Sequence, residues 1–156
     1  MTIKSISDLL KEHPFFSGLN EAYVELIGDC GRNQVYEAGA YIARENEPAD
    51  YFYLIRSGKV VIETFVPQRG MLKLQTLQGG DIVGWSWMFP PYRWEFDIRV
   101  RETVHAVELD GRCLRGKCET DTRLGYELMQ RFARVMTTRL KHTRIQLLDI
   151  YGTAGK

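Results

Sequence analysis

The chain has 156 residues, with 21 lysines and arginines against 20 aspartates and glutamates, so its formal net charge is +1. This length suits one domain with a sizeable core, and 44% hydrophobic with 26% charged residues is typical of a globular chain. So balanced a charge does not indicate binding to nucleic acid or to an anionic membrane. No apolar run approaches about 18 residues, and the first residues lack the layout of a secretory signal, so we expect a cytoplasmic protein.

The N-terminal segment, residues 1–33, is predicted to form short helices. Ser7 can cap a first turn that Pro14 ends, because proline cannot continue the hydrogen-bond ladder of a helix. Asn20 is a second capping candidate, followed by apolar residues at helical spacing up to Gly28.

Residues 34–109 have the pattern of a small β-sandwich or barrel, with short β-branched or alternating runs between glycine and polar breaks. The expected strands are Tyr41–Ala43, Tyr51–Arg56, Lys59–Val66, Leu72–Leu77, Asp81–Val83, Phe96–Val100 and Thr103–Glu108. Between two of them, the pair Ser57–Gly58 predicts a tight hairpin in which the glycine supplies a positive φ.

Residues 112–151 are predicted to be helical, with one long helix that begins at Asp121 or Thr122 and reaches Tyr151. An apolar stripe follows it at steps of three or four residues, through Met129, Phe132, Met136, Leu140, Thr143, Leu147 and Ile150. A helix that pairs with another helix shows such a stripe, so we expect a homodimer with Met129, Phe132, Met136, Leu140 and Leu147 at its interface. Packing of this stripe on the chain's own barrel is the alternative.

The sequence offers no catalytic or metal-binding motif. It contains no G-x-S-x-G, P-loop or G-x-G-x-x-G pattern, so we expect no enzyme and assign no catalytic residues. The three histidines are far apart, and Cys113 and Cys118 are too widely spaced and lack a nearby histidine, so no metal site is expected. With Cys30 the cysteines number three, which does not favour a disulfide scaffold and favours a reducing compartment.

The unusual segment is 84–96, which holds all three tryptophans of the chain. A strand cannot continue through Pro90–Pro91, so the segment must leave the sheet and return to it. Its aromatic side chains could line a pocket in which Arg93 contacts an anion, or they could form an aromatic mini-core that fills the barrel mouth. Both interpretations stay open.

The order of these parts resembles the cyclic-nucleotide-binding domains of the catabolite activator protein, of kinase regulatory subunits and of cyclic-nucleotide-gated channels. The matching segments are Pro14–Leu19, Glu37–Ile42, Tyr51–Val60 and Gly79–Gly84. The resemblance implies a single domain over residues 1–156, mainly β with flanking α: a β-roll (a double-stranded β-helix or jelly roll) with short N-terminal helices and a long C-terminal helix that often dimerises.

In this family a phosphate-binding cassette begins Gly-Glu and places an arginine about ten residues on, followed by small residues and Thr or Ser. The resemblance therefore assigns ligand binding to Gly84, Trp85, Ser86, Arg93, Trp94 and Asp97. Trp85 stands at the glutamate position, and Trp94, or Arg93 after a shift of one residue, stands at the arginine position. A tryptophan cannot accept the ribose hydrogen bonds, so we do not expect tight binding of cAMP or cGMP. A cyclic nucleotide bound weakly, or another small anion, is the expected ligand, and no cofactor is assigned.

Two functions are compatible with these features. The favoured one is a non-enzymatic, Crp/Fnr-like regulatory module that senses a small ligand and signals through a dimerising C-terminal helix; the alternative is a ligand-free dimeric protein-interaction module of the same fold, for which an unidentified protein is the partner. The long helix is basic, through Arg131, Arg134, Arg139, Lys141, His142 and Arg144. Binding to DNA by this chain alone is not expected, because five residues follow Tyr151 where a DNA-binding domain would need several dozen.

Overall fold

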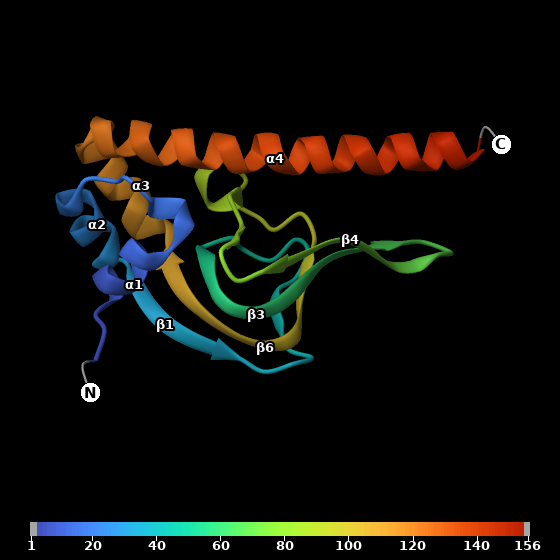
Figure 1. Ribbon diagram of the computed structural model, residues 1–156, viewed down its shortest axis with the longest axis horizontal. Coiled ribbons are helices and arrows are strands. Elements are labelled where there is room, and N and C mark those ends of the chain that lie inside the picture. Colours follow the sequence, from blue (N-terminus) through green and yellow to red (C-terminus); the bar gives the residue numbers. More distant parts are fainter. Residues whose placement is uncertain (1–2, 155–156) are drawn as a thin grey trace.

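The computed structural model describes residues 3–154, and it confirms a β-roll flanked by helices (Figure 1). The N-terminal helices are α1 (Ile6–Glu12), the 3-10 turn η1 (Pro14–Phe16) and α2 (Glu21–Gly28). The strands are β1 (Gly31–Tyr36), β2 (Tyr41–Ala43), β3 (Tyr51–Val66), β4 (Gly70–Gln78), β5 (Ile82–Val83) and β6 (Asp97–Asp110), with the 3-10 turn η2 (Ser86–Met88) between the last two. The chain ends in α3 (Gly111–Thr120) and α4 (Thr122–Ala154).

The roll is built on two long antiparallel strands, β3 and β6, in a sheet of order β1-β6-β3-β4. β2 pairs with β6, and β5 pairs with β3. Side chains alternate along β3, so that Phe52 and Leu54 face the helices while Tyr53 and Ile55 face the interior of the roll. The helix α4 lies across the top of the roll, and its distal half extends over the β3–β4 hairpin (Figure 1).

Two apolar clusters hold the domain together. One lies between the helices and the sheet and includes Phe15, Phe16, Phe52, Trp87, Leu124, Leu128 and Phe132. The other fills the roll and includes Tyr53, Val60, Ile62, Trp94, Ile98 and Val104. The cassette segment, residues 84–97, contributes one buried tryptophan to each cluster, Trp87 to the first and Trp94 to the second, and the partly buried Trp85 packs against the first.

The predicted hairpin at Ser57–Gly58 is wrong, because both residues lie inside the continuous strand β3. The pairing with β6 shifts register on either side of Ser57, so the segment is a bulge that bends the strand. Gly58 has φ +94°, and a Cβ there would come within 2.2 Å of the Thr103 carbonyl oxygen. The expected strands 96–100 and 103–108 likewise form the single strand β6. Glycine here permits close approach and curvature of paired strands, not a turn between them.

The helix caps are confirmed at one of two positions. Asn20 caps α2 by accepting a hydrogen bond from the backbone N–H of Ala22 at 2.8 Å. The cap of α1 is Ser5, which forms a capping box with Asp8, so the prediction of Ser7 is wrong. Ser7 is buried and donates instead to the carboxylate of Glu25 at 3.0 Å.

The cysteines depart from expectation, because Cys30 and Cys113 form a disulfide across 83 residues of sequence. Cys30 precedes β1 and Cys113 lies in the first turn of α3, and the backbone N–H of Asp110 donates to the Cys30 carbonyl at 2.9 Å. The fold thus brings both residues together, and Cys118 stays a free thiol. An odd cysteine count did not exclude a single bridge.

His13 is buried between α1 and η1 as a neutral ring in one tautomer. The backbone N–H of Phe15 donates to its Nδ1 at 3.2 Å, so the proton lies on Nε2, which donates to the Ile55 carbonyl at 3.1 Å. Burial lowers the pKa of His13 below its usual value of 6.5. This histidine joins the N-terminal turn to the end of the first half of β3.

Candidate functional site

The cassette segment leaves the sheet after β5 and returns at β6, as predicted. It passes from Gly84 through η2 and a cis bond between Pro90 and Pro91. It is then held against the loop of residues 44–49: the N–H of Ala49 donates to the Tyr92 carbonyl at 2.7 Å, and the N–H of Trp94 donates to the Glu47 carbonyl at 2.9 Å. The segment therefore has a fixed path.

Trp94 occupies the interior of the roll directly behind Gly84. The indole is 5% exposed and stacks on Tyr53 with ring centroids 6.4 Å apart. Gly84 has φ +97°, and a Cβ there would come within 2.5 Å of Cη2 of Trp94. Burial raises the pKa of Tyr53 well above its usual range, so its phenol is neutral. The space behind the first cassette residue is filled by an uncharged aromatic stack.

The other two tryptophans lie in different surroundings. Trp87 is buried against Phe52, with centroids 5.0 Å apart and ring planes 11° apart, and its Nε1 has no hydrogen-bond partner. Trp85 is half-buried, and the guanidinium of Arg139 on α4 lies 5.1 Å from its ring centroid. Trp87 and Trp94 are core residues, whereas Trp85 joins the cassette to α4 through a cation–π contact.

The polar cassette residues serve the neighbouring loop. Arg93 is exposed, and its Nη1 donates to the Asn46 carbonyl at 2.7 Å. Asp97 is buried and accepts from the N–H of Glu45 at 2.8 Å. Ser86 begins η2. Of the six predicted ligand residues, the structure brings Gly84 and Trp94 into contact, while Arg93 and Asp97 both bind the loop of residues 44–49.

A groove that sequence reasoning did not identify lies between α4, η1 and the β4–β5 turn. Its volume is about 450 Å³. The lining residues are Pro14, Phe15, Ser17, Gln75, Leu77, Gly80, Asp81, Ile82, Arg131, Arg134, Val135, Thr138 and Arg139. Burial lowers the pKa of Arg139 to about 10, and this guanidinium donates to the Ile82 carbonyl. In the sequence, only the spacing of the arginines along α4 pointed to this groove.

A smaller cavity of about 260 Å³ lies on another side of α4, beside η2. Trp87, Met88 and Tyr92 line it, and the guanidinium of Arg115 lies 4.2 Å from the Tyr92 ring centroid. Arg115 also donates to the Trp87 carbonyl. The aromatic segment thus borders this cavity with side chains other than those predicted to bind ligand.

The predicted interface residues on α4 separate into two groups. Phe132 is 0% exposed and packs inside its own domain, so its assignment to a dimer interface is wrong. Met136 is partly buried against the same cluster. Met129, Leu140 and Leu147 are exposed, the last two at 60% and 50%. Phe132 and Met136 therefore pack on the chain's own domain, whereas Met129, Leu140 and Leu147 lie at the surface.

Within residues 3–154, no group of three histidine, cysteine, aspartate or glutamate side chains could hold a metal ion. In the same part of the chain, no helix is long and apolar enough to cross a membrane.

Residues 33–121, more than half of the chain, match the family model described as "Cyclic nucleotide-binding domain". A cAMP-dependent protein kinase regulatory subunit from Schizosaccharomyces pombe is 34% identical over 76 residues, which are 49% of this chain and 18% of that protein. A "Probable cyclic nucleotide-gated ion channel 3" from Arabidopsis thaliana is 26% identical over 106 residues, 66% of this chain and 15% of the channel. The chain therefore corresponds to less than a fifth of the length of either relative.

Among solved structures, a "Putative Cyclic nucleotide-binding protein" from Geobacter metallireducens superposes with a TM-score of 0.78 at 25% identity. The superposition covers 89% of this chain and 99% of that one. In sequence and in fold, the chain belongs to the cyclic nucleotide-binding domain family, a family of regulatory domains that are generally not enzymes.

Proposed function

We propose that this domain is a non-enzymatic regulatory module that forms a homodimer through the distal half of α4 and does not bind cAMP or cGMP tightly. The observation that carries the proposal is the contact between Trp94 and Gly84, which fills the roll behind the cassette with an indole. The half-buried Trp85 next to it offers no acceptor for a ribose hydroxyl.

Electrostatics at the cassette support weak nucleotide binding. Arg93, the cassette's arginine, donates to the Asn46 carbonyl, and Trp94 at the neighbouring position carries no charge. The buried carboxylate of Asp97 lies on the same segment and would repel a phosphate. Binding a cyclic phosphate there would require Trp94 to leave a packed site, which costs the burial of a large aromatic side chain.

Isothermal calorimetry with cAMP and with cGMP tests this directly. We expect dissociation constants weaker than about 100 μM for both nucleotides. The variant Trp94→Ala empties the space behind Gly84 and distinguishes two causes of weak binding. If the indole blocks the site, the variant binds the nucleotide more tightly; if the ligand contacts are missing, its affinity stays the same. A dissociation constant near 1 μM for the unaltered protein, equivalent to about −8 kcal/mol, contradicts the proposal.

The dimer proposal rests on an exposed apolar surface shared by the distal half of α4 and the β3–β4 hairpin. On α4 it comprises Leu140, Ile145, Leu147, Leu148, Ile150 and Tyr151, and on the hairpin Phe65, Met71, Leu72 and Leu74. Gln146 donates to the Leu74 carbonyl at 3.2 Å, so helix and hairpin lie side by side (Figure 1). Exposed apolar side chains in such number mark an interaction site, and a second copy supplies the same helix face, on which Leu140, Leu147 and Tyr151 lie together.

Sedimentation tests the dimer. We expect the unaltered protein to be a dimer at about 50 μM, and the double variant Leu140→Glu, Leu147→Glu to be a monomer with unchanged circular dichroism, because these residues lie one heptad apart on one face. The control Thr137→Glu, Lys141→Gln makes the same change in net charge on the same helix without removing apolar surface, and it is expected to remain a dimer. A monomeric unaltered protein at that concentration excludes the proposal.

The alternative is a ligand-free dimeric interaction module, which the burial of Trp87 and Trp94 favours. Native mass spectrometry of the freshly purified protein distinguishes the two functions. A co-purified small molecule supports the sensor, and a clean dimer mass without any adduct supports the interaction module.

A further inference from the structure

The groove under α4 has the dimensions of a small-molecule site. Its volume of about 450 Å³ falls within the roughly 300–1,000 Å³ that such sites occupy. None of its lining residues belongs to the cassette, residues 84–97. One wall is α4 and the other is the β4–β5 turn with η1, so anything bound there touches both the long helix and the roll.

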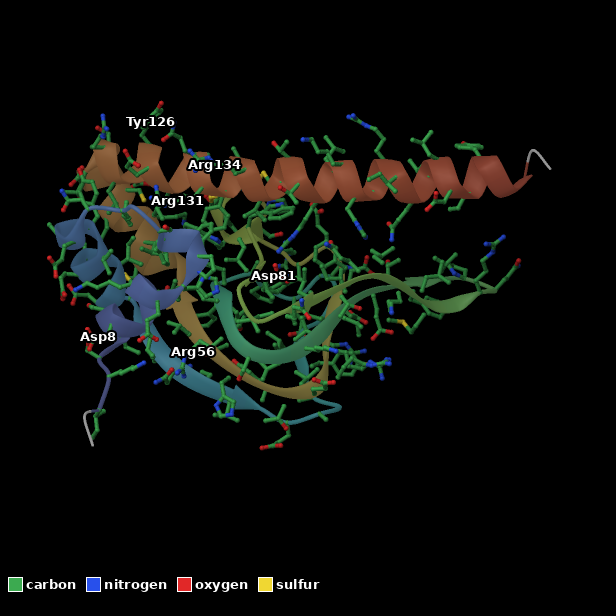
Figure 2. The ribbon with its side chains drawn as sticks, in the orientation of Figure 1. Asp8, Arg56, Asp81, Tyr126, Arg131 and Arg134 are labelled. Carbon is green, nitrogen blue, oxygen red and sulfur yellow. A yellow bond between two sulfur atoms is a disulfide. The ribbon has the colours of Figure 1, made fainter. Side chains whose placement is uncertain are left out.

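Three arginines of α4 face this groove. Arg131 is largely buried: its Nη1 pairs with the Glu127 carboxylate at 3.1 Å, its Nη2 donates to the Ser17 carbonyl at 2.9 Å, and its Nε has no hydrogen-bond partner. Arg134 lies three residues further on and is exposed, so it follows Arg131 on one side of the helix. Figure 2 labels both side chains on α4, with Asp81 on the roll below the helix.

The third arginine, Arg139, already has partners within the protein. Arg139 donates to the Ile82 carbonyl and lies over the ring of Trp85. It therefore adds positive charge to the end of the groove. The exposed Arg134 keeps its donors for a ligand, whereas Arg131 has Nη1 and Nη2 bonded to Glu127 and Ser17 and its Nε buried. The one carboxylate in the lining is Asp81, whose Oδ2 accepts from the N–H of Gln78 at 2.9 Å. Because Glu127 already pairs with Arg131, the net positive charge of the groove comes from Arg134 and Arg139 against the single lining carboxylate of Asp81.

The remaining lining defines the rest of the ligand. The planar guanidinium group can donate to two phosphate oxygens at once, which a lysine ammonium group does not match. Apolar side chains, including Pro14, Leu77 and Val135, form a surface for a hydrocarbon or ring, and Asp81 can accept from a hydroxyl or amino group. A bare inorganic ion would use only the arginines.

From this arrangement we infer that the groove binds a small organic phosphate, with its phosphate at Arg134, next to Arg131, and its organic part against the apolar wall. This names a ligand class and a site for the proposed regulatory module and therefore rests on that function. A ligand in this position binds α4 and the β4–β5 turn together, and so it favours the arrangement of the helix on the roll that the structure shows.

Titration with phenyl phosphate, followed by calorimetry and by the fluorescence of the tryptophans at low ionic strength, tests the inference. We expect saturable binding with a dissociation constant below about 1 mM, and at least tenfold weaker binding of phenol, which has the same ring without the charge. The variant Arg134→Gln is expected to weaken binding of phenyl phosphate about tenfold. Arg134→Lys keeps the charge but loses the two-pronged hydrogen bonding of the guanidinium group. Its affinity for phenyl phosphate should lie between those of the unaltered protein and of Arg134→Gln.

The matched control is Arg144→Gln, which removes an exposed arginine of the same helix outside the groove. We expect it to change the affinity less than about twofold. An equal loss in both glutamine variants, or no saturation up to about 10 mM with the unaltered protein, overturns the inference. Circular dichroism verifies that each variant is folded.

Sedimentation of the same samples separates this inference from the proposed function. If the protein is a dimer but does not bind phenyl phosphate, the inference of a groove site is wrong and the dimer proposal is supported. A monomer that binds it through Arg134 retains the site and overturns the dimer.

Discussion

Replacing Phe132 with alanine is expected to lower the free energy of unfolding by about 3–5 kcal/mol. The ring is fully buried at the point where the N-terminal turn, β3, the cassette and α4 meet. Its centroid lies 4.9 Å from that of Phe15, 5.2 Å from that of Phe52 and 5.6 Å from that of Trp87, all in edge-to-face geometry. These neighbours come from separate elements, so the cavity cannot be closed by moving one side chain.

Urea denaturation followed by circular dichroism measures this loss. The control is Phe65→Ala in the β3–β4 hairpin, where the ring is 60% exposed and the change is expected to stay within about 0.5 kcal/mol. If Phe132→Ala cost less than about 1 kcal/mol, the assignment of this residue to the core would be wrong. A glutamate at this position would unfold the domain, and so it would not report on dimerisation.

Loss of the disulfide between Cys30 and Cys113 is the second large effect. The bridge closes a loop of 83 residues, and in the chain-entropy description the lost entropy raises the free energy of the unfolded chain by about 4.5 kcal/mol. We expect Cys113→Ser to lower the free energy of unfolding by about that amount, and Cys118→Ser, which removes the free thiol, to have a much smaller effect. Urea denaturation without reductant compares the two variants.

Thiol titration provides an independent check of the bridge. Burial raises the pKa of the Cys118 thiol, so the count is made on denatured protein, where each thiol reacts freely. We expect one reactive thiol per chain before reduction and three after it. Three thiols in both samples would show that Cys30 and Cys113 are reduced in the purified protein.

The sequence predicted the parts of the fold that local chemistry determines. Asn20 marked a helix start because its side chain can accept a backbone hydrogen bond. The prolines at 90 and 91 marked the departure of the cassette from the sheet, because proline cannot donate to a strand ladder. The pattern of α4 predicted a helix from Asp121 or Thr122 to Tyr151, and the structure has it from Thr122 to Ala154.

What the sequence could not decide depends on contacts between distant residues. Gly58 is required equally by a turn and by a bulge, and the close approach of Thr103 selects the bulge. Phe132 and Leu140 have the same spacing in one stripe, but only Phe132 lies over Phe52 and Trp87. The groove forms from α4 and the β4–β5 turn, which are about 50 residues apart, so the arginine spacing alone could not reveal it.

The buried imidazole of His13 makes the stability of this domain depend on pH. Its Nδ1 faces the N–H of Phe15, so an added proton has no acceptor there and would displace an existing hydrogen bond. The native state thus binds this proton less readily than the unfolded chain, in which the pKa is close to 6.5. Above that pH His13 is neutral in both states and imposes no penalty. As the pH falls below about 6.5, the unfolded chain gains the proton first, and the stability of the fold decreases.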